Sequence, residues 1–287
     1  MRWLAVPLAV ALVLACACHR ARPADAPLRL GYFANITHAQ ALAGAADGSF
    51  ERALGGGKLE LKPFSAGPPA MEALLAGDID VTYVGAAPAI LVYVRSSGRA
   101  RVISGAARGG AALVVRDPGI TAAAQLQGKK IASPQIGNTQ DVSLRHWLKS
   151  QGIDASDGPG RQLQILPLAN AECFGLFKEG RLDAAWVPEP WVTRLLHEAG
   201  GHILVDDRDT PTTLIVASAE ALRTRRDQIA AIVRANRELT ARVKVDPDGF
   251  RAAANQGFEK VAGRKLSDSV LAEAFSRITF TTDPMAE

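Results

Sequence analysis

The sequence predicts an α/β fold of two similar α/β lobes joined by two hinge crossings. Apolar strand-like runs alternate with helical segments along most of the chain, which is typical of α/β folds with largely parallel sheets. One set of residues recurs at a constant shift of 103 positions, and the order of predicted strands and helices recurs with it. Short β-rich runs at 111–116 and 212–218 lie between and after the two halves. We expect them to carry the chain from one lobe to the other and back.

The first half alternates predicted strands with predicted helices. In chain order they are a strand at 28–33, a helix at 37–54, a strand at 59–63, a helix at 69–76, a strand at 79–84 and a helix at 88–95. The turn signal Pro118-Gly119 opens the second half. Its elements follow in the same order at 130–133, 139–151, 163–166, 172–179, 182–187 and 191–199. We therefore expect two lobes with one topology.

The repeat aligns without gaps, so that residues 28–100 are echoed by about 131–203. It pairs Asn35 with Asn138, Gly55 with Gly158, Gly57 with Gly160, Lys58 with Arg161, Gly77 with Gly180, Ile79 with Leu182, Asp80 with Asp183, Tyr83 with Trp186 and Val84 with Val187. Single glycine matches mean little in a chain with 26 glycines. Their agreement on one shift indicates two halves of similar topology.

The C-terminal part is predicted to be helical, at 219–224, 226–243, 247–261 and 267–275. Ile229, Ile232 and Leu239 lie on about one face of the longest of these helices, so we expect it to pack on the first lobe. The first lobe is therefore predicted to comprise 28–115 plus 212–287, and the second lobe 116–211.

The N-terminus has the pattern of a secretory signal. Residues 1–15 hold a positive charge and then an apolar stretch too short to span a bilayer. Val13-Leu14-Ala15-Cys16 resembles the lipobox of bacterial lipoproteins, which predicts lipidation at Cys16 and a lipid-anchored linker at 16–27. Cys18 is the poorer candidate, and an ordinary signal peptide with two incidental cysteines is the alternative. Cys173 is interpreted as a small buried hydrophobe.

The composition excludes several classes of protein. The 287 residues are 48% hydrophobic and 22% charged, so the chain can bury a full core and is neither disordered nor fibrous. The net charge of +4 is spread along the chain, so we expect no nucleic-acid partner. The five histidines are scattered and predict no metal site. Motifs for a nucleophile elbow, a phosphate loop or a dinucleotide do not occur, so we expect no cofactor and no enzymatic activity.

The repeat indicates where a ligand site lies, because ligands of parallel α/β sheets bind beyond the carboxyl ends of the strands, near helix N-termini. The candidate ligand-binding residues therefore come from both halves. They are Asn35, His38, Ser65, Gly85, Ala86 and Arg108 in the first half, and Gly137, Asn138, Thr139, Gln140, Trp186 and Glu189 in the second.

Several of these candidates also have a purely structural interpretation. Asn138 is equally expected as a helix cap, and His38 as a polar cap or packing residue. Arg108 is the candidate positive partner in the cleft, and a solvated surface arginine is the alternative. Trp186 is expected either to wall the pocket or to pack in a core. Glu189 opposes a simple anion site, unless it accepts an N–H from the ligand or ties the two lobes together.

Four motifs occur in order along residues 28–284. They are Gly31-Tyr32-Phe33-Ala34-Asn35-Ile36-Thr37-His38-Ala39-Gln40-Ala41-Leu42, Gly77-Asp78-Ile79-Asp80-Val81-Thr82-Tyr83-Val84-Gly85 with Pro88, Gly137-Asn138-Thr139-Gln140-Asp141-Val142, and Trp186-Val187-Pro188-Glu189-Pro190-Trp191. Together they resemble the nitrate, sulfonate and taurine family of ABC transporter solute-binding proteins.

The resemblance implies a type II periplasmic-binding fold that closes on a small anionic solute and delivers it to the membrane subunits of an ABC importer. It also implies a monomer in the periplasm or cell envelope, held at a membrane by the lipid anchor. The first-loop residues differ among the sulfonate-binding branches, so Asn35 and His38 do not identify the ligand. Sulfonates, taurine, nitrate, phosphonates, organic acids and thiamine precursors all remain open.

Two other functions fit the same fold. Thiamine-pyrimidine synthases resemble it, so a related enzyme or binding protein is the main alternative. An enzyme needs a reactive side chain facing the pocket, for which Cys173 and His38 are the candidates. A periplasmic sensor domain is the third interpretation, and it would need a signalling partner elsewhere.

Overall fold

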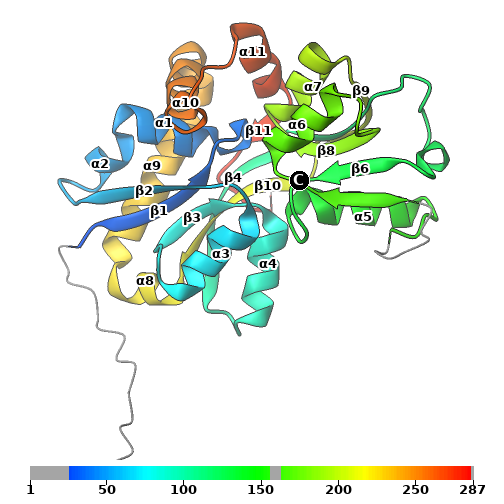
Figure 1. Cartoon of the computed structure of the whole chain (residues 1–287). Helices are drawn as coiled ribbons and strands as arrows, with labels where there is room; N and C mark the ends of the chain where they lie inside the picture. The colour runs from blue at the N-terminus through cyan, green and yellow to red at the C-terminus, as the bar shows by residue number, and fades with distance from the viewer. Residues whose placement is uncertain (1–25, 156–162, 286–287) are drawn as a thin grey trace, which may run out of the picture.

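The computed structural model describes residues 26–155 and 163–285 and has two lobes, each built on its own sheet (Figure 1). The predicted signal peptide at 1–15, Cys16 and all but the last two residues of the linker at 16–27 lie outside the described residues, as do three partners of the predicted repeat, Gly158, Gly160 and Arg161. Within the described part of the chain, no helix is long and apolar enough to cross a membrane.

The first sheet has six strands in the order β11-β4-β10-β3-β1-β2. Its strands are β1 (Leu28–Phe33), β2 (Leu59–Phe64), β3 (Val81–Val84), β4 (Ala100–Gly109), β10 (Pro211–Ser218) and β11 (Ile278–Phe280). β1 pairs in parallel with both β2 and β3. β10 runs antiparallel between β3 and β4, and β11 extends the β4 edge.

The second sheet repeats this arrangement with five strands in the order β7-β6-β8-β5-β9. Its strands are β5 (Ala111–Val115), β6 (Lys130–Ser133), β7 (Gln164–Pro167), β8 (Ala184–Pro188) and β9 (His202–Asp207). β6 is parallel to its two neighbours, and β5 runs antiparallel between β8 and β9. In each sheet, therefore, one antiparallel strand enters from the other half of the chain and occupies the same position.

The position of β5 corrects the predicted lobe boundary. Ala111–Val115 was expected to end the first lobe, yet it pairs on both sides within the second sheet. All five of its residues are buried, as expected of a central strand, but an apolar run cannot show to which sheet it belongs. The chain crosses between the lobes at Gly109 and Gly110, which both have positive φ angles of 67° and 69°.

The helices cover both faces of each sheet. They are η1 (Ile36–His38), α1 (Ala39–Asp47), α2 (Ser49–Ala53), α3 (Gly67–Ala76), α4 (Ala86–Arg95), η2 (Ala123–Leu126), α5 (Thr139–Ser150), α6 (Asn170–Lys178), α7 (Trp191–Ala199), α8 (Ala219–Thr224), α9 (Arg226–Val245), α10 (Pro247–Ala262) and α11 (Asp268–Ser276). The predicted helix at 37–54 is broken at Gly48, which adopts a left-handed conformation with φ 76°. α9 buries Ile229, Ile232 and Leu239 in the first-lobe core, which confirms its predicted packing.

The structure also refines the sequence repeat. Val81 of β3 and Ala184 of β8 occupy matching positions at the predicted shift of 103, but their strand partners Leu30 and Ile131 differ by 101. Two extra residues therefore lie between β6 and Asn138, so the gapless alignment is wrong for the first strand. A single constant shift hides such an insertion, because it falls in a loop between two matched elements.

Candidate ligand-binding site

A small cavity lies between the lobes, where the carboxyl ends of β1, β3, β6 and β8 face each other. Its lining comprises Phe33, Asn35, Thr37, His38, Ser65, Ala66, Gly85, Asn138, Thr139, Gln140, Asn170, Pro188 and Thr212. The cavity volume of about 10 Å³ has room for about one water molecule. The lobes are therefore closed on each other, with polar groups of both at the point of contact.

Four helices begin at this cavity. α3 and α4 come from the first lobe, and α5 and α6 from the second. In the described structure, the N-cap residues Ala66, Gly85, Asn138 and Ala169 make no side-chain hydrogen bond to their helices. The first-turn N–H groups of a helix lack helical partners and carry the positive end of its dipole. Four such ends from two lobes meet where no described lining residue carries a formal charge.

The second lobe reaches two of these helix ends with side chains. Gly67 donates its N–H to Asn138 Oδ1 at 3.4 Å, and Ala87 donates its N–H to Thr139 Oγ1 at 3.3 Å. These distances lie at the long end for hydrogen bonds. A Cβ atom at Gly85 would lie 2.2 Å from Thr139 Oγ1. The first-lobe backbone must therefore be bare here for the lobes to meet.

Asn35 joins the lobes on the other side of the cavity. Its Oδ1 accepts hydrogen bonds from Asn170 Nδ2 at 3.5 Å and from Trp191 Nε1 at 3.3 Å. Asn170 Oδ1 is buried without a hydrogen-bond partner in the described structure. A buried polar atom without a partner is costly, so the cavity has unused hydrogen-bonding capacity.

His38 lines the same cavity and is buried. Its ring stacks on Phe33 at a centroid distance of 4.4 Å, and its Nδ1 has no hydrogen-bond partner among the described residues. Burial lowers the pKa of His38 to about 3, so the ring is neutral at physiological pH. A neutral imidazole presents one donor and one acceptor, so His38 offers polarity to the cavity without charge.

Most of the twelve predicted site residues line the cavity or adjoin residues that do. Asn35, His38, Ser65, Gly85, Asn138, Thr139 and Gln140 line the cavity. Ala86 opens α4 beside them, and Gly137 precedes Asn138 with its N–H bonded to Asp141 Oδ2 at 2.9 Å. That these residues contact a ligand stays a prediction.

Arg108 and Trp186, two of the candidate site residues, are not among the residues that line the cavity. Arg108 Nε donates to the carbonyl of Asp209 at 3.1 Å, beside the hinge crossing. Trp186 belongs to the second-lobe core and packs edge-on against Trp147. Trp186 sits within β8 on the face that is covered by α5, so the structural interpretation applies to this residue.

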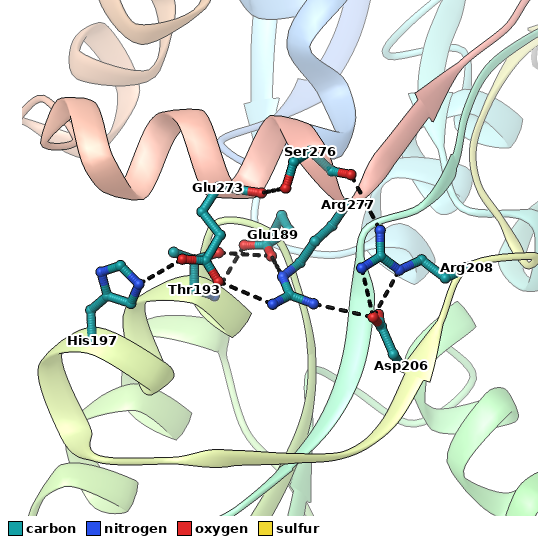
Figure 2. Close-up of polar contacts among 8 residues, drawn as sticks. All are labelled: Glu189, Thr193, His197, Asp206, Arg208, Glu273, Ser276 and Arg277. Atoms are coloured by element: carbon teal, nitrogen blue, oxygen red, sulfur yellow. Dashed lines mark hydrogen bonds and ion pairs between the residues drawn. The ribbon is translucent and has the colours of Figure 1, made fainter.

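Glu189 ties the lobes together (Figure 2). Its N–H donates to the Gly110 carbonyl at 2.7 Å, and its own carbonyl accepts from Ile36 N–H at 2.9 Å. Its carboxylate accepts from Thr193 N–H at 3.1 Å and Thr193 Oγ1 at 2.9 Å, and Arg277 Nε lies 3.4 Å away. Burial raises the pKa of Glu189 to about 7, against the lowering effect of Thr193 and Arg277.

Sequence reasoning missed several residues of the cavity wall. They are Phe33, Thr37, Ala66, Asn170, Pro188 and Thr212. The repeat could have indicated Asn170, because it lies 103 positions after Gly67 and opens α6 as Gly67 opens α3. The others are revealed by the closed arrangement of the lobes.

A larger hollow of about 1130 Å³ lies on the first lobe between the end of α3 and the start of α9. Two of its arginines form ion pairs inside it, Arg29 with Asp80 and Arg223 with Glu220. All of its lining residues belong to the first lobe, so closure of the two lobes does not enclose it. Within residues 26–155 and 163–285, no cluster of three or more metal-binding side chains occurs.

A protein-family model matches most of the chain. The NMT1-like family model matches residues 21–256. The chain belongs to the NMT1-like family. Among curated proteins, this NMT1-like chain is similar to a putative binding protein of Brucella abortus (strain 2308), with 28% identity over 178 residues, or 62% of this chain and 52% of that protein. The chain thus spans about half the length of that relative.

Two other similar proteins carry names that concern the binding of a solute or an ABC transporter. A putative aliphatic sulfonates-binding protein of Escherichia coli (strain K12) is 28% identical over 160 residues, which are 54% of this chain and 48% of that protein. A putative ABC transporter periplasmic binding protein of Brachyspira hyodysenteriae is 26% identical over 249 residues, covering 79% of this chain and 69% of that protein.

Solved structures share the fold. The alkanesulfonate-binding protein SsuA from Xanthomonas axonopodis pv. citri, bound to MOPS, superposes with a TM-score of 0.76 at 20% identity, covering 91% of this chain and 86% of that one. The nitrate-binding protein NrtA from Synechocystis PCC 6803 gives a TM-score of 0.66 at 17% identity, covering 82% and 66%. The NMT1-like chain therefore has the expected type II periplasmic-binding fold.

Proposed function

We propose that this protein is an extracytoplasmic solute-binding protein of an ABC importer, and that it captures a small anionic solute of the sulfonate, taurine or nitrate kind between its lobes. The carrying observation is the meeting of four helix N-termini from two lobes at one cavity. Such N-termini bind anions through backbone N–H groups and the helix dipole. The names of the similar proteins support the same class of ligand.

Binding by neutral donors suits a carrier that must also release its solute. When the lobes close, water is excluded, and the hydrogen bonds from the N–H groups to the anion become stronger. The closed state is favoured by the contacts that it adds. Asn138 Oδ1 and Thr139 Oγ1 now accept from first-lobe N–H groups. On entry, an anion's oxygens would replace these two acceptors.

The enzyme alternative lacks a reactive group at the cavity among the described residues. Cys173 is buried outside the lining, donates to the Leu168 carbonyl at 3.3 Å, and has its pKa raised to about 12 by burial and the nearby Glu172 carboxylate. A thiol in this state is a poor nucleophile. His38 has a pKa of about 3 and is a weak general base at neutral pH.

A thermal-shift screen of the purified protein tests the proposed ligand class. Ethanesulfonate, taurine, nitrate, methylphosphonate and an aminopyrimidine are compared, because a ligand that binds the folded state raises the melting temperature. We expect a rise with one class of anion, a smaller rise in Asn138→Ala, and an unchanged one in Gln135→Ala, a control from the preceding loop. A rise with the aminopyrimidine alone would favour the thiamine-related alternative. No rise with any anion would contradict the proposal.

Anchoring at Cys16 is part of the proposal and has its own test. Cells that express the protein are grown with an alkyne-tagged fatty acid, and the lipid on the protein is detected by click chemistry. We expect labelling of the natural chain and of Cys18→Ser, and none of Cys16→Ser. Labelling that persists in Cys16→Ser and disappears in Cys18→Ser would place the lipid on Cys18. No labelling of any variant would contradict lipid anchoring.

A further inference from the structure

The C-terminal segment belongs to the first lobe by its packing. β11 pairs with β4 of the first sheet, with Ile278 opposite Gly109. On α11, Phe275 is buried against Phe250 and Phe280 at centroid distances of 6.0 and 5.4 Å. Hydrophobic contacts of this kind fix α11 to the first lobe.

The polar side of the same helix faces the second lobe (Figure 2). Arg277 bonds within its own segment to Glu273 Oε1 at 3.0 Å. Across the lobes, Arg277 lies 3.2 Å from Asp206 Oδ2 of β9 and 3.4 Å from Glu189 Oε1 before α7. Glu273 Oε2 lies 2.6 Å from His197 Nε2 of α7. Arg277 and Glu273 of the first lobe thus contact β9, the connection between β8 and α7, and α7 itself.

This network lies beside the hinge and outside the cavity. A Cβ atom at Gly109, where the chain first crosses, would lie 2.9 Å from the carbonyl oxygens of both Arg208 and Arg277. Arg208 of the second crossing donates to the Ser276 carbonyl at 3.2 Å. Because α11 moves with the first lobe while β9 and α7 move with the second, a rotation of one lobe about the hinge changes the distances across this network.

We infer that Arg277 is a positioning residue for lobe closure, which holds the second lobe in its closed orientation through Asp206 and Glu189. The side chain of Arg277 is 14% exposed and that of Glu189 is 0% exposed. The attraction between such buried charges is largely offset by their loss of hydration. Opening returns that hydration, so the contact biases the closed state without locking it. This inference rests on the proposed function for its effect on ligand affinity, but not for its effect on lobe orientation.

The first part of the test needs no ligand. Spin labels are placed at Glu72→Cys on α3 and Glu172→Cys on α6, both exposed and in different lobes, in a protein with Cys16 and Cys18 replaced by serine. Pulsed EPR then measures the distance between the lobes. We expect Arg277→Gln to shift the distances toward longer values and Arg277→Lys to shift them less. Arg251→Gln is the control, because Arg251 pairs with Asp248 on its own helix, and we expect no shift.

The second part measures the affinity for the anion that gives the largest thermal shift. If the closed fraction falls tenfold, the apparent dissociation constant rises by about tenfold. Distances in Arg277→Gln equal to those of the natural protein would overturn the inference, whatever the ligand does. A shift in distances without any anion binding would leave the inference standing and contradict the proposed function. Asp206→Asn serves as a second variant if Arg277→Gln does not fold.

Discussion

The two lobes share a topology but wall the cavity with different chemistry. The first lobe presents bare backbone at Gly67 and Gly85, where α3 and α4 begin. The second lobe directs side chains at these two helix ends, where Asn138 Oδ1 accepts from the Gly67 N–H and Thr139 Oγ1 from the Ala87 N–H. Bare N–H groups form a fixed surface, whereas side chains can be exchanged by mutation without moving the backbone. The proposed function therefore predicts that an anion contacts the N–H groups of α3 and α4, and that Asn138 and Thr139 set how closely the second lobe approaches them.

The largest effect is expected from adding a side chain at Gly85 of the first lobe. In Gly85→Ala the new Cβ would lie 2.2 Å from Thr139 Oγ1 and 3.2 Å from its Cβ, so the lobes cannot close fully. We expect a loss of affinity of about 100-fold or more by calorimetry, since closure supplies the ligand contacts. Thr139→Ala should recover part of this loss in the double variant. Gly175→Ala, with open space at its Cβ position, is the control. Natural affinity in Gly85→Ala would refute the close approach.

The lobes also differ at the amino ends of their parallel strands, where one aspartate directly precedes β3 and another directly precedes β8. Asp80 accepts a hydrogen bond from the Arg29 N–H and pairs with the Arg29 guanidinium at 3.0 Å. The Arg29 and Asp80 side chains are 12% and 10% exposed. Asp183 accepts from the Lys130 N–H and lies 3.8 Å from Lys129, with both side chains 38% exposed. We expect Asp80→Asn to lower the free energy of unfolding by about 3 kcal/mol and Asp183→Asn by less than about 1 kcal/mol. Urea unfolding measures both, and equal costs would show that the two pairs are equivalent.

A smaller effect is expected from trimming the second lobe at Asn170. Its amide bonds Asn35 across the cavity at 3.5 Å. Removing one hydrogen-bonding group costs about 1 kcal/mol, so Asn170→Ala should weaken anion binding by about fivefold in calorimetry. Gln164→Ala, exposed on β7 of the same lobe, should bind as the natural protein does. If the two variants behave alike, Asn170 contributes to the wall and not to affinity.

The smallest effect is a pH dependence from Glu189. Burial raises the pKa of Glu189 to about 7. A raised carboxyl pKa gives stability that is fully present below the ordinary value and is lost as pH rises through about 7. Arg277, Thr193 and Glu273 face this carboxyl. The pKa of His38 is lowered to about 3. This residue therefore makes the free energy of unfolding rise with pH, but only below about pH 6.5.

Between pH 6.5 and 8, therefore, Glu189 should lower the free energy of unfolding by about 1 kcal/mol or less. Chemical unfolding at several pH values measures this change. Glu189→Gln removes the titrating group and should flatten the profile in that window. A profile that is identical in the variant would assign the slope to another group.

Sequence reasoning predicted the architecture better than the site. Periodicity and the repeat indicated two α/β lobes, because the spacing of apolar residues within short stretches of sequence indicates each strand and each helix. The sequence did not reveal that Ala111–Val115 belongs to the second sheet, because a run of apolar residues does not indicate with which strands it pairs. At the site, Asn138 and Asn35 follow strands and line the cavity, whereas Arg108 and Trp186 do not. The strand-end rule locates an edge of the sheet, but which side chains face the cleft depends on packing between lobes.

The most direct test of the account is a crystal structure of the protein grown with 2-bromoethanesulfonate, whose bromine gives an anomalous signal. We expect the sulfonate between the lobes, with its oxygens within hydrogen-bonding distance of the N–H groups at the starts of α3, α4 and α5, and with no arginine or lysine in contact. A sulfonate bound to Arg108 or to the arginine-lined hollow of the first lobe, with the space between the lobes empty, would contradict it.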